Sequence, residues 1–313
     1  MRLSRPLVRG WSEGTVLRIL IALILALATL LPCLAQAYDV LLLVSRRDQA
    51  SEEVLKGFRA GCSSSHRTLV LSDYAEVDLT RILREENPRL ILTLGDAALK
   101  AARRVSRTPV VSLMALGVRQ QAALQSNLTG IDMFASPESY MELFKKLKVS
   151  RVGVVYDQAR SGWYLRKARQ AAEKAGITLV TREVDSSRDA LEKLASLSGK
   201  VDALWMLPDV TAVTRETSEA YFRFGQSQSV PVVSFSASYL GLGAGAVVEI
   251  DRKDLGRQAC DMVDDLLKKG RGSDMPLAFP RNTSTRMNPD VIRHLGSGIV
   301  SGHQISLAAL FGE

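Results

Sequence analysis

Several residues that could bind a charged small molecule come directly after apolar runs typical of buried strands. Asp209 follows the run Val201–Leu207, and its carboxylate could hold a ligand ammonium group by a charge-assisted hydrogen bond. An aspartate is equally suited to cap the following helix. Asp96 has the same two possible roles, and there the cap is favoured. Arg46 could bind a carboxylate bidentately, although the adjacent Arg47 is typical of a solvated basic loop.

Hydroxyl and aromatic side chains occupy similar positions. Ser234 and Ser236 could donate hydrogen bonds to a carboxylate. Trp163, Tyr156 and Tyr239 could stack on a planar ligand, although aromatic residues near strand ends more often belong to the core. Ligands of open α/β sheets bind beyond the carboxyl ends of the strands. The predicted ligand-binding residues are therefore Ser45, Arg46, Gly95, Asp96, Ser112, Met114, Tyr156, Asp157, Trp163, Pro208, Asp209, Ser234, Ser236 and Tyr239.

No pattern of residues indicates catalysis, a cofactor or a metal site. His66, His294 and His303 are scattered, and none has a carboxylate partner at helical spacing. The stretch Gly241–Ala246 superficially fits a dinucleotide-binding pattern, but an apolar strand-like run follows it instead of a helix. Neither a nucleophile-elbow motif nor a zinc-protease motif is present. We therefore predict that the protein is not an enzyme, and we predict no catalytic residue, no metal and no cofactor.

Composition indicates a globular protein with no nucleic-acid partner. The chain has 313 residues, 46% hydrophobic and 24% charged, with a formal net charge of +8. The first 37 residues contain four Arg and one Glu, so the remainder has a net charge of +5. This excess is small and scattered, which does not fit a nucleic-acid-binding surface.

The N-terminus has the order of features of a secretory signal peptide. Basic residues end at Arg18, an apolar run spans Ile19–Leu31, and small residues close at Ala37. Cleavage after Ala37 is predicted; an uncleaved membrane anchor is the alternative. A lipoprotein modified at Cys33 is disfavoured by the proline and leucine beside it. The predicted location is the periplasm, which excludes chemistry that depends on cytoplasmic ATP or nicotinamide cofactors.

Two cysteines, Cys62 and Cys260, follow the predicted signal peptide. In an oxidising compartment they could form a single disulfide. Buried free cysteines are also common, so both states are open at this point.

Strand-like runs alternate with amphipathic stretches, which predicts βαβ units and parallel sheets. The predicted strands are Asp39–Val44, Thr68–Leu71, Arg89–Leu94, Pro109–Leu113, Arg151–Tyr156, Ile177–Val180, Val201–Leu207 and Val230–Ser234. The predicted helices are Ala50–Ala60, Leu79–Glu86, Asp96–Val105, Pro137–Lys148, Gly162–Ala175, Arg188–Leu197, Val210–Gln226 and Asp251–Lys269. Two such series indicate two lobes. Leu116–Ile131 is the predicted exit from the first lobe, and Gly270–Thr285 is predicted to be a crossing strand or linker.

An ordered set of stretches resembles the periplasmic substrate-binding proteins of ABC transporters, in the group that includes tryptophan-binding proteins. The matching stretches are Leu90–Ala102, Thr108–Val111, Asn127–Asp132, Arg151–Asp157, Val201–Val213, Val230–Ala244 and Asp254–Gly270. The chain departs from the family pattern at Asp96-Ala97 and at Met114–Gly117, both near the expected ligand site, where a departure could change the ligand.

The resemblance implies an α/β fold of the type I periplasmic-binding-protein kind, with two doubly wound parallel-sheet lobes joined by a hinge and the ligand between them. The expected N-terminal lobe comprises residues 38–131 and 251–281, and the C-terminal lobe comprises 132–250 and 282–296, followed by a tail at 297–313.

The expected function is that of a periplasmic solute-binding component of an ABC importer. It would act as a monomer, bind a small organic ligand such as an amino acid, aromatic ones favoured, and deliver it to an ABC permease in the inner membrane. One alternative is a periplasmic sensor that docks on a membrane receptor. The other is a secreted α/β enzyme that uses Asp209 or Asp96 as a base.

Overall fold

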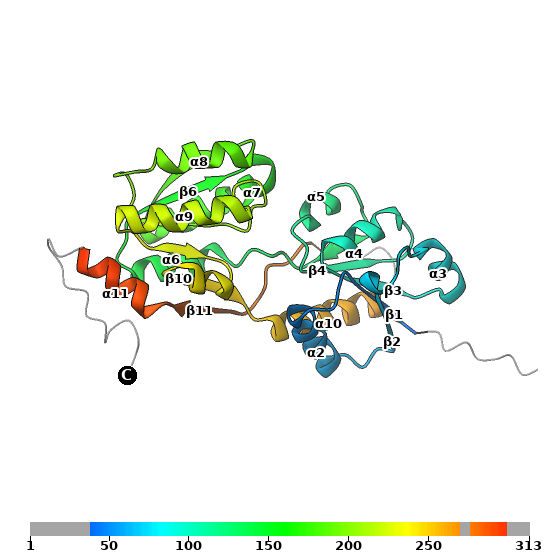
Figure 1. The fold of residues 1–313 in the computed structure, drawn as a ribbon. Helices are drawn as coiled ribbons and strands as arrows, with labels where there is room; N and C mark the ends of the chain where they lie inside the picture. Colours follow the sequence, from blue (N-terminus) through cyan, green and yellow to red (C-terminus); the bar gives the residue numbers. More distant parts are fainter. Residues whose placement is uncertain (1–37, 270–275, 299–313) are drawn as a thin grey trace, which may run out of the picture. The chain divides into compact units, whose positions relative to one another are not determined.

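The computed structural model describes residues 38–269 and 276–298, which form two separate sheets covered by helices (Figure 1). Within these residues the first sheet has five parallel strands in the order β2-β1-β3-β4-β5. Its strands are β1 (Val40–Val44), β2 (His66–Val70), β3 (Leu90–Leu94), β4 (Val110–Leu113) and β5 (Leu128–Gly130). Strands β1, β3 and β4 are buried along their whole length, as strands covered on both faces should be.

The second sheet has, among the described residues, six strands in the order β11-β10-β9-β8-β6-β7. They are β6 (Arg151–Tyr156), β7 (Thr178–Glu183), β8 (Ala203–Trp205), β9 (Val232–Ser234), β10 (Ala246–Ile250) and β11 (Thr283–Met287). All pairs are parallel except the edge pair of β10 and β11, which is antiparallel. The two sheets are therefore predominantly parallel, and this agrees with the predicted fold class.

Helices cover both faces of each sheet. The described helices are α2 (Gln49–Gly61), α3 (Leu79–Glu86), α4 (Asp96–Ala101), α5 (Val118–Ala122), α6 (Pro137–Lys146), α7 (Gln158–Ala175), α8 (Ser187–Ala195), α9 (Arg215–Gln228), α10 (Arg252–Lys269) and α11 (Pro289–Gly298). Helices α2 and α10 cover one face of the first sheet, and α3, α4 and α5 cover the other. In the second sheet, α6, α7 and α11 pack on one face, and α8 and α9 pack on the other.

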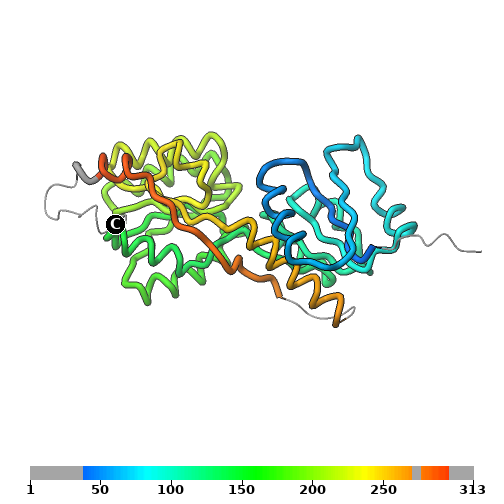
Figure 2. Tube along the Cα trace, turned by 90° about the horizontal axis from the view of Figure 1, so that it is seen from below, coloured from blue at the N-terminus to red at the C-terminus, as the bar shows by residue number. Residues whose placement is uncertain are grey.

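Three segments connect the first sheet and its helices to the second sheet and its helices (Figure 2). The first is the segment after β5, the second is the segment between β10 and α10, and the third is the segment before β11. The first and third are hydrogen-bonded to each other, because the Asp132 N–H donates to the Ala278 carbonyl at 2.9 Å and the Ala278 N–H donates to the Gly130 carbonyl at 3.0 Å. The backbone at this crossing is therefore held by strand-like pairing.

The structure corrects several predicted elements. The interval Leu116–Ile131, from which the chain leaves the first sheet, contains α5 and the edge strand β5, and neither element was predicted. The predicted helix from Val210 begins only at Arg215, where Thr214 caps it through a reciprocal capping box. The α-helix from Asp96 ends at Ala101 and continues as the 3₁₀ helix η2 (Ala102–Arg104).

No helix among the described residues has the length and apolar character needed to span a bilayer. The predicted signal peptide, its cleavage site and Cys33 lie outside the described residues, as does the tail after residue 298.

Candidate functional site

The ends of β1 and β3 bring two predicted site residues together. The N–H of Ala98, at the start of α4, donates to the Ser45 hydroxyl at 2.9 Å. Gly95 has a φ of +90°, and a Cβ there would lie 2.6 Å from the same hydroxyl oxygen. Glycine is therefore required at this turn both for its backbone conformation and for space. Ser45 supplies a hydrogen-bond acceptor to α4 that the helix's own N-cap, Gly95, lacks.

Asp96 holds the loop that leads into α5. Its carboxylate accepts from the Leu116 N–H at 3.4 Å and from the Gly117 N–H at 3.1 Å. The predicted role as a cap of its own helix is wrong, because the N-cap is Gly95 and no side chain caps α4 from that position. The physical reason is that Asp96 is the first residue inside the helix, from which its carboxylate turns toward the neighbouring loop. Contact of Asp96 with a ligand stays a prediction.

The end of β4 carries an unpaired hydroxyl and a strained backbone. Ser112 is fully buried, and its hydroxyl has no hydrogen-bond partner within the described part of the chain. Met114 has a φ of +53°, which is uncommon for a residue other than glycine. Unpaired buried polar groups and strained backbone both concentrate at functional sites. Arg46, in contrast, is exposed and forms an ion pair with Asp48 at 2.8 Å, as in a solvated loop.

In the second lobe, Asp209 is at the centre of a hydrogen-bond network at the ends of β6 and β8. One carboxylate oxygen accepts from the Asp157 N–H at 2.8 Å and from the Ser161 hydroxyl. The other accepts from the N–H groups of Thr211 at 2.9 Å and Ala212 at 3.0 Å. Asp209 is buried, so these four protein donors account for its ordinary hydrogen-bonding capacity. It caps the turn that precedes α9, and the helix itself is capped by Thr214.

Asp157 lies beside this network and caps α7. Its carboxylate accepts from the Ala159 N–H at 2.8 Å and from the Thr211 hydroxyl at 2.7 Å. Pro208, which precedes Asp209, is buried. Three predicted site residues therefore lie together near the ends of β6 and β8, namely Asp157, Pro208 and Asp209.

The remaining predicted residues of the second lobe are separated from one another. Ser234 is fully buried, and its hydroxyl contacts the Met206 sulfur at 3.1 Å. Tyr156 is buried in the α6–α7 face of the sheet. Tyr239 packs on the opposite face, 5.3 Å from Phe235 between ring centroids. These contacts are the core roles that aromatic residues near strand ends usually have.

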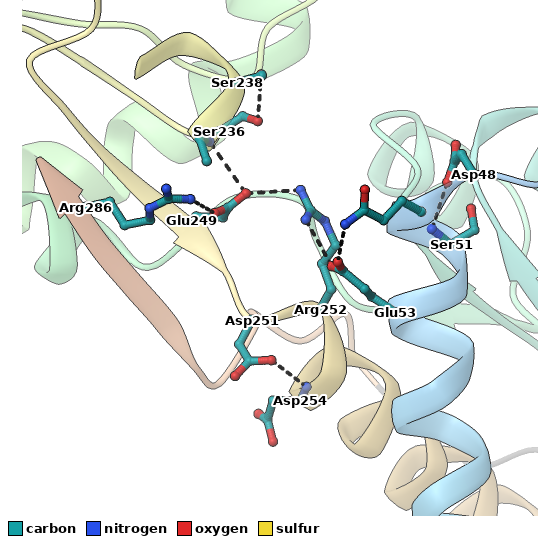
Figure 3. A network of polar contacts seen from close by, with 12 residues as sticks. Asp48, Ser51, Glu53, Ser236, Ser238, Glu249, Asp251, Arg252, Asp254 and Arg286 are labelled. Carbon is teal, nitrogen blue, oxygen red and sulfur yellow. Dashed lines mark hydrogen bonds and ion pairs between the residues drawn. The ribbon is translucent and has the colours of Figure 1, made fainter. Parts of the chain in front are cut away.

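Ser236 belongs to a polar network around Glu249 (Figure 3). Its hydroxyl lies 3.0 Å from that of Ser238, and the next N–H, of Ala237, donates to Glu249 at 3.5 Å. Arg252 donates to Glu249 at 3.1 Å and to Glu53 of α2 at 3.2 Å. The first residue of α10 thus links the end of β10 to α2 by ion pairs.

Trp163 forms a cation–π contact with Arg119. The Arg119 guanidinium carbon lies 3.6 Å from the centre of its indole ring. Arg119 is on α5, which follows β4 of the first sheet, and Trp163 is on α7, which follows β6 of the second. The ring is held by a hydrogen bond from its Nε1–H to the Arg160 carbonyl at 3.2 Å, and it stacks on Phe279 at 6.0 Å. A cation over an indole face is a favourable pair, strengthened when it is partly desolvated.

Arg119 is also paired with a buried carboxylate. Its Nη2 donates to Asp132, which directly follows the crossing from β5. Burial raises the pKa of Asp132, and the neighbouring Arg119 lowers it in part. Within the described residues the Nε–H of Arg119 and the Oε1 of the adjacent Gln120 are buried without hydrogen-bond partners. Such groups are costly unless a partner reaches them.

Arg119, Gln120 and Asp132 were not predicted as site residues. Arg119 and Gln120 lie in Leu116–Ile131, the predicted exit from the first lobe, and Asp132 directly follows it, so none of them comes directly after a predicted strand. The signal that could have found them is an arginine and an aspartate in the mostly apolar and amide-rich stretch between the predicted strand Pro109–Leu113 and the predicted helix Pro137–Lys148.

A hollow of about 420 Å³ lies elsewhere, along α9. It is lined by Arg215, Ser218, Glu219, Phe222, Arg223, Gln226 and Leu242. None of the predicted site residues lines it, and its walls come from one helix and the 3₁₀ helix η3 (Ala237–Leu242). The hollow is therefore separate from the residues around Arg119.

Comparison with known proteins gives a family match and a fold match. A family model described as ABC transporter substrate binding protein matches residues 72–309. The tyrosine-binding protein of Clostridioides difficile strain R20291 is 23% identical over 183 residues, which are 57% of this chain and 52% of that protein. The chain thus spans about half the length of this relative.

Two solved structures are similar in fold. The first is an ABC domain in complex with L-Trp from Streptococcus pneumonia, with a TM-score of 0.58, 21% identity, and coverage of 83% of this chain and 95% of the other. The second is the ligand-free, open structure of a substrate-binding protein with adhesive properties from Clostridium difficile, with a TM-score of 0.62, 20% identity and the same coverage. These similarities confirm the predicted two-lobed type I periplasmic-binding-protein fold.

Proposed function

The chain belongs to the family of ABC transporter substrate-binding proteins, and from that premise we propose that it binds an aromatic amino acid between its two lobes. The names of a tyrosine-binding relative and of a tryptophan complex with the same fold support this ligand class. The family and the fold are those of binding proteins, so we propose binding without turnover.

The observation that carries the proposal is the position of the Arg119 guanidinium over the Trp163 ring. An aromatic amino acid offers a carboxylate, an ammonium group and a ring. A guanidinium binds carboxylates with directed hydrogen bonds, and an indole offers a flat apolar surface for a ring. Arg119 and Trp163 therefore supply, at one place, chemistry for two of the three groups of such a ligand, its carboxylate and its ring.

Asp132 leaves the Nε–H of the Arg119 guanidinium available. Arg119 uses Nη2 for Asp132, whereas its Nε–H has no partner among the described residues. A ligand carboxylate that accepts from Nε would satisfy a buried donor, which is worth more than a hydrogen bond that replaces water. The oriented guanidinium also has little conformational freedom left to lose on binding.

Ligand binding would favour lobe closure, because Arg119 and Trp163 are on helices that follow strands of different sheets. A ligand that contacts both residues binds the closed arrangement more tightly than the open one, and it shifts the equilibrium by this difference. We propose as lobes residues 38–131 with 251–281 and residues 132–250 with 282–296, the strands of each sheet falling within one set.

We further propose that the protein is an exported, monomeric component of an importer. The signal-peptide pattern of residues 1–37 supports export, and the family supports an ABC permease as the partner. N-terminal sequencing of the periplasmic form should begin at Tyr38. Uptake of the labelled ligand should fall when the gene is deleted, whereas a pure sensor would leave uptake unchanged.

A thermal-shift screen of the twenty amino acids tests the ligand class. At 100 times its dissociation constant a ligand stabilises the folded state by about 2.7 kcal/mol. We expect tryptophan, tyrosine or phenylalanine to raise the melting temperature and to be recovered unchanged by chromatography. Stabilisation by none of the three would contradict the proposed ligand class, and conversion of a stabilising ligand to a product would contradict binding without turnover.

A further inference from the structure

Helices α2 and α10 pack in direct backbone contact along the first sheet (Figure 1). A Cβ at Gly57 would lie 2.0 Å from the Lys253 carbonyl oxygen, and a Cβ at Gly256 would lie 2.1 Å from that of Val54. Only glycines allow this spacing. Contacts advance in the same direction along both helices, from Glu53 and Arg252 toward their C-terminal ends, so the helices run parallel.

The two cysteines lie on this interface, just beyond the paired glycines. Cys260 is one helical turn after Gly256, and Cys62 is the C-cap residue of α2. Both are free thiols in the structure, and their sulfur atoms lie within 4.8 Å of each other and of a carboxylate oxygen of Asp264. The close helix spacing set by Gly57 and Gly256 therefore places one thiol opposite the other.

We propose that Cys62 and Cys260 form an intramolecular disulfide when the protein meets an oxidant, so that α10 becomes covalently joined to the end of α2. An oxidising compartment for this reaction follows from the export proposed above. The oxidant is itself a disulfide, either oxidised glutathione or the disulfide of a thiol oxidoreductase.

The reaction balances as two thiol–disulfide exchanges. Cys62 is partly exposed and Cys260 is buried, so the Cys62 thiolate attacks the oxidant first and releases one thiol. The Cys260 thiolate then attacks the Cys62 sulfur, forms the S–S bond and releases the second thiol. Two protons leave the cysteines, and two electrons reduce the oxidant's disulfide to its two thiols.

The surroundings favour this bond over a metal ion. Asp264 accepts from the Ser64 hydroxyl at 3.2 Å and lies 3.9 Å from the Cys62 sulfur, so the three groups could in principle bind zinc. Structural zinc sites have four protein ligands, and among the described residues only these three groups meet here. A disulfide requires only the two sulfur atoms. Burial raises the pKa of both thiols, and the Asp264 charge adds to the effect, so the exchange is slow at neutral pH.

The test uses the full chain with Cys33→Ser, in which Cys62 and Cys260 are the two remaining thiols. The protein is incubated with oxidised glutathione at about pH 8.5 for several hours, because the raised pKa values slow thiolate formation. We expect no titratable thiol after denaturation, a mass lower by two hydrogen atoms than that of the reduced form, and a proteolytic peptide pair that contains Cys62 and Cys260. Reduction should lower the melting temperature by about 5–10 °C, with no such effect in the Cys62→Ser variant.

Two free thiols that persist after this treatment would overturn the proposal. So would one bound zinc per chain that protects both thiols from the oxidant and is lost in Asp264→Asn, since that result assigns the cluster to a metal. Amino-acid binding is not a readout here. If the protein binds no aromatic amino acid, the result of the thiol experiment still stands. If the two thiols stay free, the proposed function still stands.

Discussion

The Arg119 guanidinium lies over the indole of Trp163, 3.6 Å from the ring centre, although the two residues are on helices that follow strands of different sheets. The same guanidinium pairs with buried Asp132. Arg119 therefore connects an aromatic surface, a buried charge and the backbone crossing, which makes it the most informative residue to replace.

Arg119→Met should weaken aromatic amino-acid binding about 10- to 100-fold, since a hydrogen bond to a charged group is worth about 1.5–3 kcal/mol. Titration calorimetry measures the effect. Arg103→Met, at an exposed position on η2, removes the same charge and should leave affinity unchanged. Because Asp132 loses its partner in Arg119→Met, Arg119→Lys serves as a second variant that retains a positive charge. Unchanged affinity in both Arg119 variants would exclude this residue from the ligand site.

Asp96→Ala should weaken binding about 3- to 10-fold through the loop that its carboxylate holds. The loss of two backbone hydrogen bonds to the loop before α5, worth about 1 kcal/mol, loosens the helix that carries Arg119. Asp96→Asn retains an acceptor oxygen and should restore most of the affinity. Asp185→Ala, at an exposed position on the second lobe, is the matched control for calorimetry. A loss in Asp96→Asn as large as in Asp96→Ala would point to direct ligand contact instead.

Asp209→Ala should lower the free energy of unfolding of the ligand-free protein by at least about 3 kcal/mol, because four buried donors lose their acceptor. Urea unfolding measures this loss, and Asp209→Asn, which keeps an acceptor, should lose less. A ligand-free stability near that of the parent, together with lost binding, would instead support the predicted role of Asp209 as a ligand contact.

Asp254 should make stability depend on pH at the acidic end. Burial alone would raise its pKa, but ion pairs with Arg281 and Arg257, each at 3.1 Å, lower it below the ordinary value of 3.8. The folded state thus holds the proton more weakly than the unfolded state. The stabilisation is present above about pH 3.8 and is lost as the pH falls through the lowered value.

Urea unfolding between pH 6 and pH 2 checks this prediction. Asp254→Asn should be less stable than the parent by about 1–3 kcal/mol at pH 6, and the two curves should approach each other at pH 2. Asp265→Asn, which removes an exposed pair with Lys269, should follow the parent at every pH. A constant gap between parent and Asp254→Asn would show that the ion pairs do not cause the loss.

Gly57→Ala should destabilise the first lobe by about 2–3 kcal/mol, because the added methyl group cannot fit against the Lys253 carbonyl without separating α2 from α10. Thermal unfolding measures this loss. The comparison is Gly241→Ala, where a Cβ would meet no atom within 4 Å and the change should be close to neutral. Equal melting temperatures for the two variants would contradict the backbone contact.

Elements with strong apolar patterns were predictable from the sequence. Strands such as β3 and β6 are buried on both faces, so their runs of Leu, Ile and Val are nearly continuous. Short elements were not predictable, because their sequences are too short to show an apolar pattern. Helix α5 has five residues and β5 has three, too few to show a period, and β5 lies at the edge of its sheet.

The site was predicted only in part, because strand ends locate a region and not the side chains that meet there. Trp163 was predicted from its position near the end of β6, and it contacts Arg119. Arg119 and Asp132 are 13 positions apart and meet through an ion pair that no local spacing reveals. Asp96 was predicted to cap α4, but the N-cap is Gly95, one residue earlier. Sequence patterns do not locate the end of a helix to within one residue.

The pairing of α2 with α10 also constrains the order in which the chain can fold. Arg252 and Glu53 are 199 positions apart, and the whole second sheet except β11 is made between them. During synthesis, the first lobe must wait for the last quarter of the polypeptide, whereas most of the second can form beforehand. Until α10 arrives, α2 and one face of the first sheet expose apolar surface that a chaperone could bind.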